Sequence, residues 1–165
     1  MTPESAFDQY SQTVYSFLYR LTRRADLAED LAQETFLAFV RAPGRFDPAR
    51  GKVKTYLFSI ARNLALNHYR DSREDQMDDD EPSLSADPRP GLDIGSAVAQ
   101  ALAVLPHLQQ EALILFEYEG ATLEEIAQIV GADTGTVKSR LHRARERLRR
   151  ELAPYRNVRG LHGAV

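Results

Sequence analysis

The sequence predicts an all-α protein with two small helical domains joined by a flexible acidic linker. In several segments, apolar residues recur at three- and four-residue steps, which is typical of helices with one buried face. The chain lacks the alternating β-branched runs expected of strands. Residues 71–94 are rich in acid and proline and poor in large apolar side chains, so they cannot build a core of their own.

The N-terminal domain is expected to span residues 1–70 and to hold three helices. Its first helix has an apolar face formed by Phe7, Tyr10, Val14, Phe17, Leu18 and Leu21. Asp26 and Glu29 predict a capping pair for a second helix that runs to about Ala42. After a loop at 45–51, the third helix has an inner stripe of Val53, Leu57, Ile60, Ala61 and Leu64.

The C-terminal domain is expected to span residues 95–153, with a tail at 154–165. It opens with two short helices, the first carrying Ile94, Val98, Ala101, Leu102 and Leu105 and the second running to about Tyr118. Thr122 and Glu125 predict a capping box for a helix that ends at a glycine turn. The last helix has an inner face of Val137, Leu141, Ala144, Leu148 and Leu152. This pair of helices predicts a helix-turn-helix.

Charge is distributed unevenly along the chain. The net charge is −3, yet residues 71–94 alone carry −7 and residues 134–150 carry +6. The four consecutive acids at 78–81 lack the alternating spacing of a metal loop, so a solvated charge run is favoured over a metal site. The acidic centre therefore masks a basic stripe suited to phosphate.

Composition also bounds the compartment and the chemistry. There is no cysteine, which excludes disulfides and thiolate metal sites, and no apolar run approaches the ~18 residues of a membrane span. The N-terminus is unlike a signal peptide. We expect a cytoplasmic protein without membrane insertion, metal or cofactor.

The last helix carries the strongest functional signal. Its outward residues are Thr136, Lys138, Ser139, Arg140, His142, Arg143, Arg145 and Arg147. Such side chains near a helix N-terminus can enter a major groove, where Arg and Lys read guanine edges. A merely soluble basic helix is the alternative.

Two other helices have unusual polar faces. Asp30 and Glu34 lie four residues apart in the second helix with Gln33 beside them, which suits either a basic partner or solvent. The third helix interleaves basic and aromatic residues around its apolar stripe, among them Lys54, Tyr56, Phe58, Arg62 and Asn63. That mixture suits single-stranded DNA, where bases stack on rings and phosphates meet charges. Tyr56 or Phe58 could equally belong to the core.

Together these segments resemble the extracytoplasmic-function (ECF) sigma factors of the sigma-70 family. The segment 26–36, DLAEDLAQETF, resembles their polymerase-binding region. The segments RFDP at 45–48 and TYLFSIARN at 55–63 resemble their promoter-melting and −10 region. The segments EEIA at 124–127 and GTVKSRLHRAR at 135–145 resemble their −35-reading helix-turn-helix.

The resemblance implies a sigma factor, not an enzyme, that binds core RNA polymerase and promoter DNA and has a cognate anti-sigma factor. Asp30, Gln33 and Glu34 would dock on the clamp coiled coil of the largest polymerase subunit. Asn63 would hold a flipped −10 base, beside Lys54, Tyr56 and Arg62, with the loop at 45–51 helping to form its pocket. Four residues would face −35 bases: Lys138, Ser139, His142 and Arg143. Phosphates would be met by Thr136, Arg140 and Arg145.

Two other classes remain to be distinguished. A stand-alone helix-turn-helix repressor would explain the last helix but not the acidic face of the second helix. An enzyme would need metal-ligand spacing among the histidines or a nucleophile motif, and the sequence has neither.

Overall fold

A computed structural model of the protein describes residues 2–72 and 94–155. Within these ranges the chain is helical and contains no strand, which confirms the predicted fold class. The α-helices are α1 (Pro3–Thr22), α2 (Ala25–Arg41), α3 (Val53–Ser72), α4 (Ile94–Ala103), α5 (His107–Leu113), α6 (Leu123–Val130) and α7 (Thr134–Glu151). Short segments are η1 (Pro43–Arg45), a π-helical turn η2 (Ile114–Tyr118) and η3 (Ala153–Tyr155).

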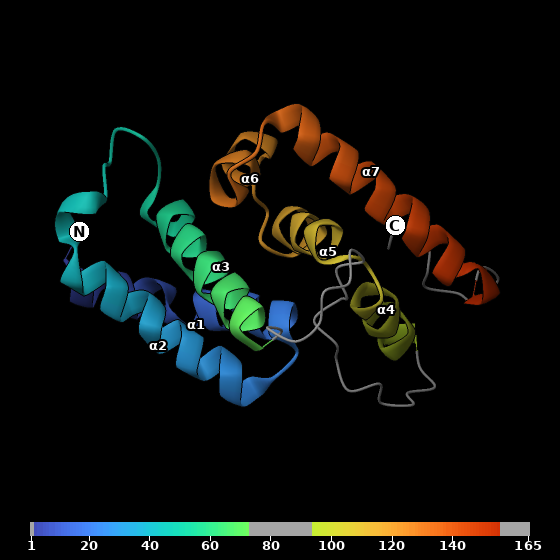
Figure 1. The fold of residues 1–165 in the computed structure, drawn as a ribbon, viewed down its shortest axis with the longest axis horizontal. Coiled ribbons are helices and arrows are strands. Elements are labelled where there is room, and N and C mark those ends of the chain that lie inside the picture. Colours follow the sequence, from blue (N-terminus) through green and yellow to red (C-terminus); the bar gives the residue numbers. More distant parts are fainter. Residues whose placement is uncertain (1, 73–93, 156–165) are drawn as a thin grey trace.

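Helices α1–α3 form an N-terminal lobe and α4–α7 a C-terminal lobe (Figure 1). The predicted linker at 71–94 overlaps the end of α3 and the start of α4 and otherwise lies outside the described residues. The predicted tail at 154–165 overlaps η3 and otherwise also lies outside them.

The N-terminal core forms where the three helices meet. Phe17 and Leu21 of α1 are fully buried, and the ring of Phe17 lies 4.8 Å from that of Phe58 in α3. The expectation that Tyr56 or Phe58 joins the core is therefore confirmed for Phe58, which is 2% exposed. A left-handed Arg23, with φ of 60°, ends α1 and lets α2 return alongside it.

Three details of the N-terminal lobe differ from the prediction. Arg24, not Asp26, is the N-cap of α2, and no side chain caps that end; Asp26 lies in the first turn and accepts a hydrogen bond from Arg24. Phe7 of α1, expected on the apolar face, is 49% exposed. Its ring packs edge-on against Phe36, which leaves the other side open. Along α3, the predicted inner residues Ile60 and Leu64 are half-buried instead of fully buried.

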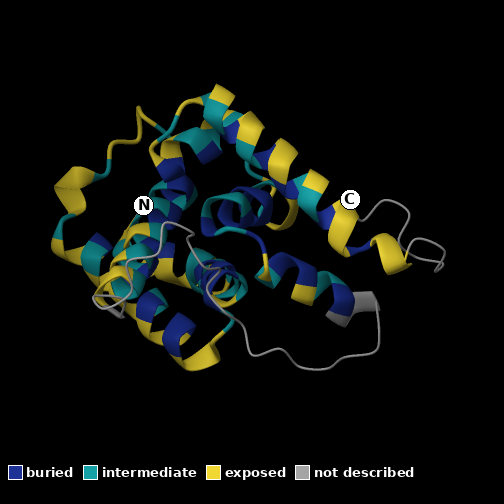
Figure 2. Ribbon diagram, turned by 45° about the vertical axis from the view of Figure 1, so that its right-hand side comes forward, coloured by how far each residue is buried: buried dark blue, intermediate teal, exposed yellow. Residues whose placement is uncertain are grey.

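The C-terminal lobe follows its sequence signals closely. The side chain of Thr122 accepts from the Glu125 N–H at 3.1 Å, and the Glu125 carboxylate accepts from the Thr122 N–H at 3.0 Å. This is the predicted capping box of α6. Gly131 ends α6 at φ of 69°, a conformation that favours glycine. All five predicted inner residues of the last helix are buried, while its outer side is largely exposed (Figure 2).

The two lobes pack against each other mainly through α3 and α6 (Figure 1). Side-chain hydrogen bonds between Arg62 and Glu111 also join α3 to α5. The π-helical turn η2 also contacts α1. Polar side chains form hydrogen bonds across this contact at several points.

Candidate nucleic-acid interface

Three aromatic rings fix the loop that precedes α3. Phe46 in this loop lies 5.4 Å from Tyr56 in α3 and 6.3 Å from Phe39 in α2, measured between ring centroids. Tyr56 and Phe39 complete the triangle at 6.1 Å. Aromatic packing at these separations is favourable beyond the area buried. The loop is therefore held against both helices.

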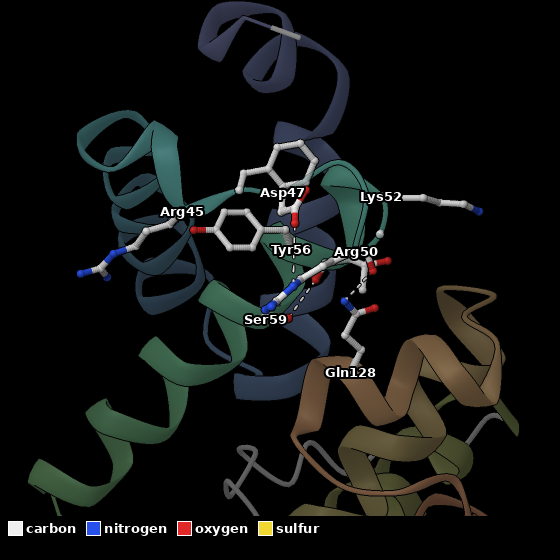
Figure 3. A pocket seen from close by; sticks show the side chains of 10 residues that line it. Arg45, Asp47, Arg50, Lys52, Tyr56, Ser59 and Gln128 are labelled. Atoms are coloured by element: carbon white, nitrogen blue, oxygen red, sulfur yellow. Dashed lines mark hydrogen bonds and ion pairs between the residues drawn. The ribbon is translucent and has the colours of Figure 1, made fainter.

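A pocket of about 380 Å³ opens between this loop and the start of α3 (Figure 3). Its lining comprises Arg45, Phe46, Asp47, Arg50, Gly51, Lys52, Thr55, Tyr56, Ser59 and Gln128. Aromatic walls flanked by three cations suit an unstacked base and its phosphates. Gln128 differs from the rest because it comes from α6 of the other lobe and reaches toward the loop.

Predicted −10 residues fall into two groups. Tyr56 lines the pocket, and Asn63 is exposed two turns further along the same side of α3. Lys54 and Arg62 instead face the C-terminal lobe. Lys54 donates to the backbone carbonyl of Glu119 at 3.4 Å and lies over the Phe58 ring.

Arg62 is held by a buried carboxylate. Its Nε and Nη2 donate to the two carboxylate oxygens of Glu111 at 3.0 and 2.9 Å. The side chains are 12% and 0% exposed. His107, one turn earlier in α5, places Nε2 3.4 Å from the same carboxylate. Burial works to raise the pKa of Glu111, but His107 and Arg62 outweigh it and hold the pKa below its ordinary value.

The exposed face of α7 collects the residues predicted to read −35 bases. Lys138, Ser139, His142 and Arg143 are all exposed. Their spacings of one, three and four residues place them on one side of the helix. Asp133 caps the helix by accepting from the Thr136 N–H at 2.7 Å, and this backbone hydrogen bond lowers the pKa of Asp133.

The residues predicted to meet phosphates are less exposed than those predicted to read bases, and Arg145 contacts other side chains of the protein. Thr136 and Arg140 are half-buried on the first turns of α7. Arg145 lies 3.5 Å from the carboxylate of Glu117 and over the ring of Phe116, at 5.1 Å from its centroid. The Arg145 side chain is one-third exposed and remains reachable from solvent.

Helix α2 presents the predicted polymerase-binding residues beside an apolar groove. Asp30 and Glu34 are exposed, and Gln33 lines the groove, which has a volume of about 570 Å³. Its other lining residues are Pro3, Glu4, Phe7, Asp8, Phe36, Leu37 and Val40. The exposed apolar side chains Leu37 and Val40 lie one and two turns beyond Gln33, so acidic and apolar surface adjoin on one side of α2.

Sequence reasoning missed Glu111 and Gln128. Glu111 had one usable signal: it lies three residues after Leu108 and four before Leu115, on an apolar helix face where a carboxylate needs a partner. Gln128 had none, since its role depends on how the lobes dock.

Across 2–72 and 94–155, no group of three or more His, Cys, Asp or Glu side chains is placed to hold a metal ion. None of the described helices is both long and apolar enough to cross a membrane.

Comparison with known proteins finds a family match for each lobe. Residues 6–74 match the family model of Sigma-70 region 2, and residues 96–148 match that of Sigma-70, region 4. RNA polymerase sigma factor CarQ of Myxococcus xanthus is 34% identical over 151 residues, which cover 88% of this chain and 86% of CarQ. ECF RNA polymerase sigma factor SigW of Bacillus subtilis is 30% identical, with coverage of 88% and 86%. For ECF RNA polymerase sigma factor SigE of Mycolicibacterium smegmatis, at 35% identity, the match spans 60% of the relative.

Solved structures agree with these matches. A chain in the co-crystal structure of the sigma factor RpoE with the anti-sigma factor NepR from Bartonella quintana aligns with a TM-score of 0.72 at 28% identity. The alignment covers 91% of this chain and 96% of that one. Sigma factors are regulatory DNA-binding proteins rather than enzymes. The chain belongs to the ECF RNA polymerase sigma factors of the sigma-70 family, which act in transcription initiation.

Proposed function

We propose that this chain works in the cytoplasm by binding core RNA polymerase through α2 and reading promoter DNA with both lobes. Helix α7 reads −35 bases in duplex DNA, and the pocket at the start of α3 receives a −10 base from the melted strand. The chain supplies position and specificity, and the polymerase carries out the chemistry.

The observation that carries this proposal is the joint presence of two unlike DNA surfaces. One is the exposed basic face of α7, shaped for a major groove. The other is the pocket walled by Phe46 and Tyr56, which is shaped for an unstacked base. A protein that binds only duplex DNA has no use for the second surface.

The surface of α2 supports the polymerase contact. Asp30 and Glu34 add like charges to a helix face at a small cost in stability, which a basic partner would reverse. Leu37 and Val40 beside them offer apolar area that a partner can bury. A helical segment with basic and apolar residues, such as a polymerase coiled coil, fits both features.

An anti-sigma factor is the proposed regulator. One of the solved structures similar to this chain contains the anti-sigma factor NepR together with the sigma factor RpoE. We infer that a protein of that class binds this chain and withholds it from the polymerase.

Reconstituted run-off transcription tests the proposal. Core polymerase plus this chain should transcribe a cognate promoter, and either component alone should not. Asn63→Ala should lose most of this activity because the −10 base loses its partner. Asn67→Ala, an exposed asparagine one turn further along α3, is the matched control and should keep it. Equal activity of both variants would contradict the −10 assignment.

A further inference from the structure

The side of α3 that carries cations is covered by oxygen acceptors of the C-terminal lobe. Arg62 binds the carboxylate of Glu111, and Lys54 donates to the carbonyl of Glu119. At the start of α3, Lys52 lies 3.9 Å from the carboxylate of Glu125. Lys52 directly precedes α3, and Lys54 and Arg62 lie within its first three turns. Each meets an acceptor of the kind that a DNA phosphate would offer.

The same lobe also reaches into the base pocket. Gln128 of α6 donates to the backbone carbonyl of Arg50 at 3.0 Å. Its amide lies 3.2 Å from the point that a Cβ on Gly51 would occupy, so the side chain rests directly against the loop (Figure 3). A base that enters the pocket from this side meets Gln128.

We propose that the C-terminal lobe and the melted −10 strand compete for this face of α3, so that the closed chain is autoinhibited. Glu111 is the anchor of the closed form, and Gln128 closes the pocket. The inference rests on the proposed function, since it takes α3 as the −10 surface.

The contacts rank clearly in strength. Lys52 is 79% exposed, and ion pairs in solvent contribute little. Arg62 and Glu111 are desolvated and joined by two parallel hydrogen bonds, the geometry that adds most in energy and direction. Because both lobes belong to one chain, the competitor acts at a high effective concentration. A free DNA strand must overcome it, whereas a partner that separates the lobes removes it.

Energy transfer between two dyes on the full chain reports closure directly. The chain has no cysteine, so Gln9→Cys in α1 and Glu151→Cys in α7, both at exposed positions, can be labelled selectively. A fluorescent mixed-sequence DNA single strand reports access to α3. Glu111→Gln keeps the side-chain shape and should lower transfer. The strand should then bind about tenfold more tightly, as expected if roughly nine molecules in ten were closed.

Glu124→Gln is the matched control. It removes the same charge from an exposed position on α6, so both signals should stay at the parent values. Two variants of the exposed Gln128 avoid any change to the core. Gln128→Lys faces Arg50 and Lys52 and should open the lobes, while Gln128→Glu should hold them closed and weaken strand binding.

The inference is overturned if Glu111→Gln and both Gln128 variants keep the parent transfer and affinity. It is also overturned if the lobes open without a gain in strand binding. Failure of the proposed function looks different: the parent would then show closure but no core-dependent transcription that requires Asn63.

Discussion

Arg62 of α3 and Glu111 of α5 form a two-point ion pair across the contact between the lobes, with nitrogen–oxygen distances of 3.0 and 2.9 Å. The pair joins a helix matched by sigma-70 region 2 to one matched by region 4. A residue of the proposed −10 helix is thereby tied to the lobe that carries the proposed −35 helix.

Acid should weaken this connection. The pKa of Glu111 lies below the ordinary 4.5, because His107 and Arg62 outweigh the opposing effect of burial. The carboxylate of Glu111 therefore binds a proton less tightly in the folded protein than in the unfolded chain. The pair stabilises the fold above pH 4.5, and that stabilisation is lost as the pH falls through the lower folded-state pKa. Urea unfolding across this range should show the loss in the parent and a flatter profile in Glu111→Gln.

Reversing the acidic face of α2 should abolish polymerase binding without unfolding the protein. Asp30→Arg with Glu34→Arg changes two exposed charges, so the free energy of unfolding should change by less than ~1 kcal/mol. Size-exclusion binding to core polymerase measures the loss. Asp8→Arg with Glu4→Arg, on α1 across the groove, shows whether the effect is specific to α2. Normal binding by the α2 double variant would refute the assigned surface.

Base and phosphate contacts on α7 should separate in binding measurements. Arg143→Ala should cost roughly 1–3 kcal/mol at one −35 base pair and relax the preference there. Arg145→Ala should weaken binding to all sequences about equally and reduce the salt slope by about one unit. Titrations of promoter variants at several salt concentrations, with core polymerase present, give both quantities. The assignment fails if the two variants behave alike.

The capping box of α6 should support the helix-turn-helix. Thr122→Ala removes the acceptor for the Glu125 N–H and should lower the free energy of unfolding by about 1 kcal/mol. Thr122→Ser keeps the hydroxyl and should retain most of the stability. Thermal unfolding of the three proteins compares them; equal stability of Thr122→Ala and the parent would show that the cap contributes nothing.

Local signals in the sequence predicted most of the elements. The box at Thr122, the glycine at 131 and the inner face of α7 each depend on neighbours within four residues, and each is found as expected. The capping pair at Asp26 was wrong because Asp26 lies in the first turn, where an acid is favourable without being the cap.

Long-range features were not predictable in the same way. Arg62 was expected at DNA, but its partner Glu111 lies 49 residues away, and no periodic pattern reports such a pair. Gln128 lines the pocket only because the two lobes pack together, and no local sequence pattern predicts that packing. The exposed basic residues of α7 could be predicted, because their exposure depends only on the periodicity of the helix on which they lie.

Promoter binding with and without core polymerase tests the central claim most directly. The free chain should bind duplex promoter DNA weakly, since its net charge is −3 and each lobe alone offers DNA only a small contact. Adding core polymerase should produce tight, sequence-specific binding in a gel-shift titration. Tight and specific binding by the chain alone, unchanged by core polymerase, would contradict the account and indicate a stand-alone helix-turn-helix repressor.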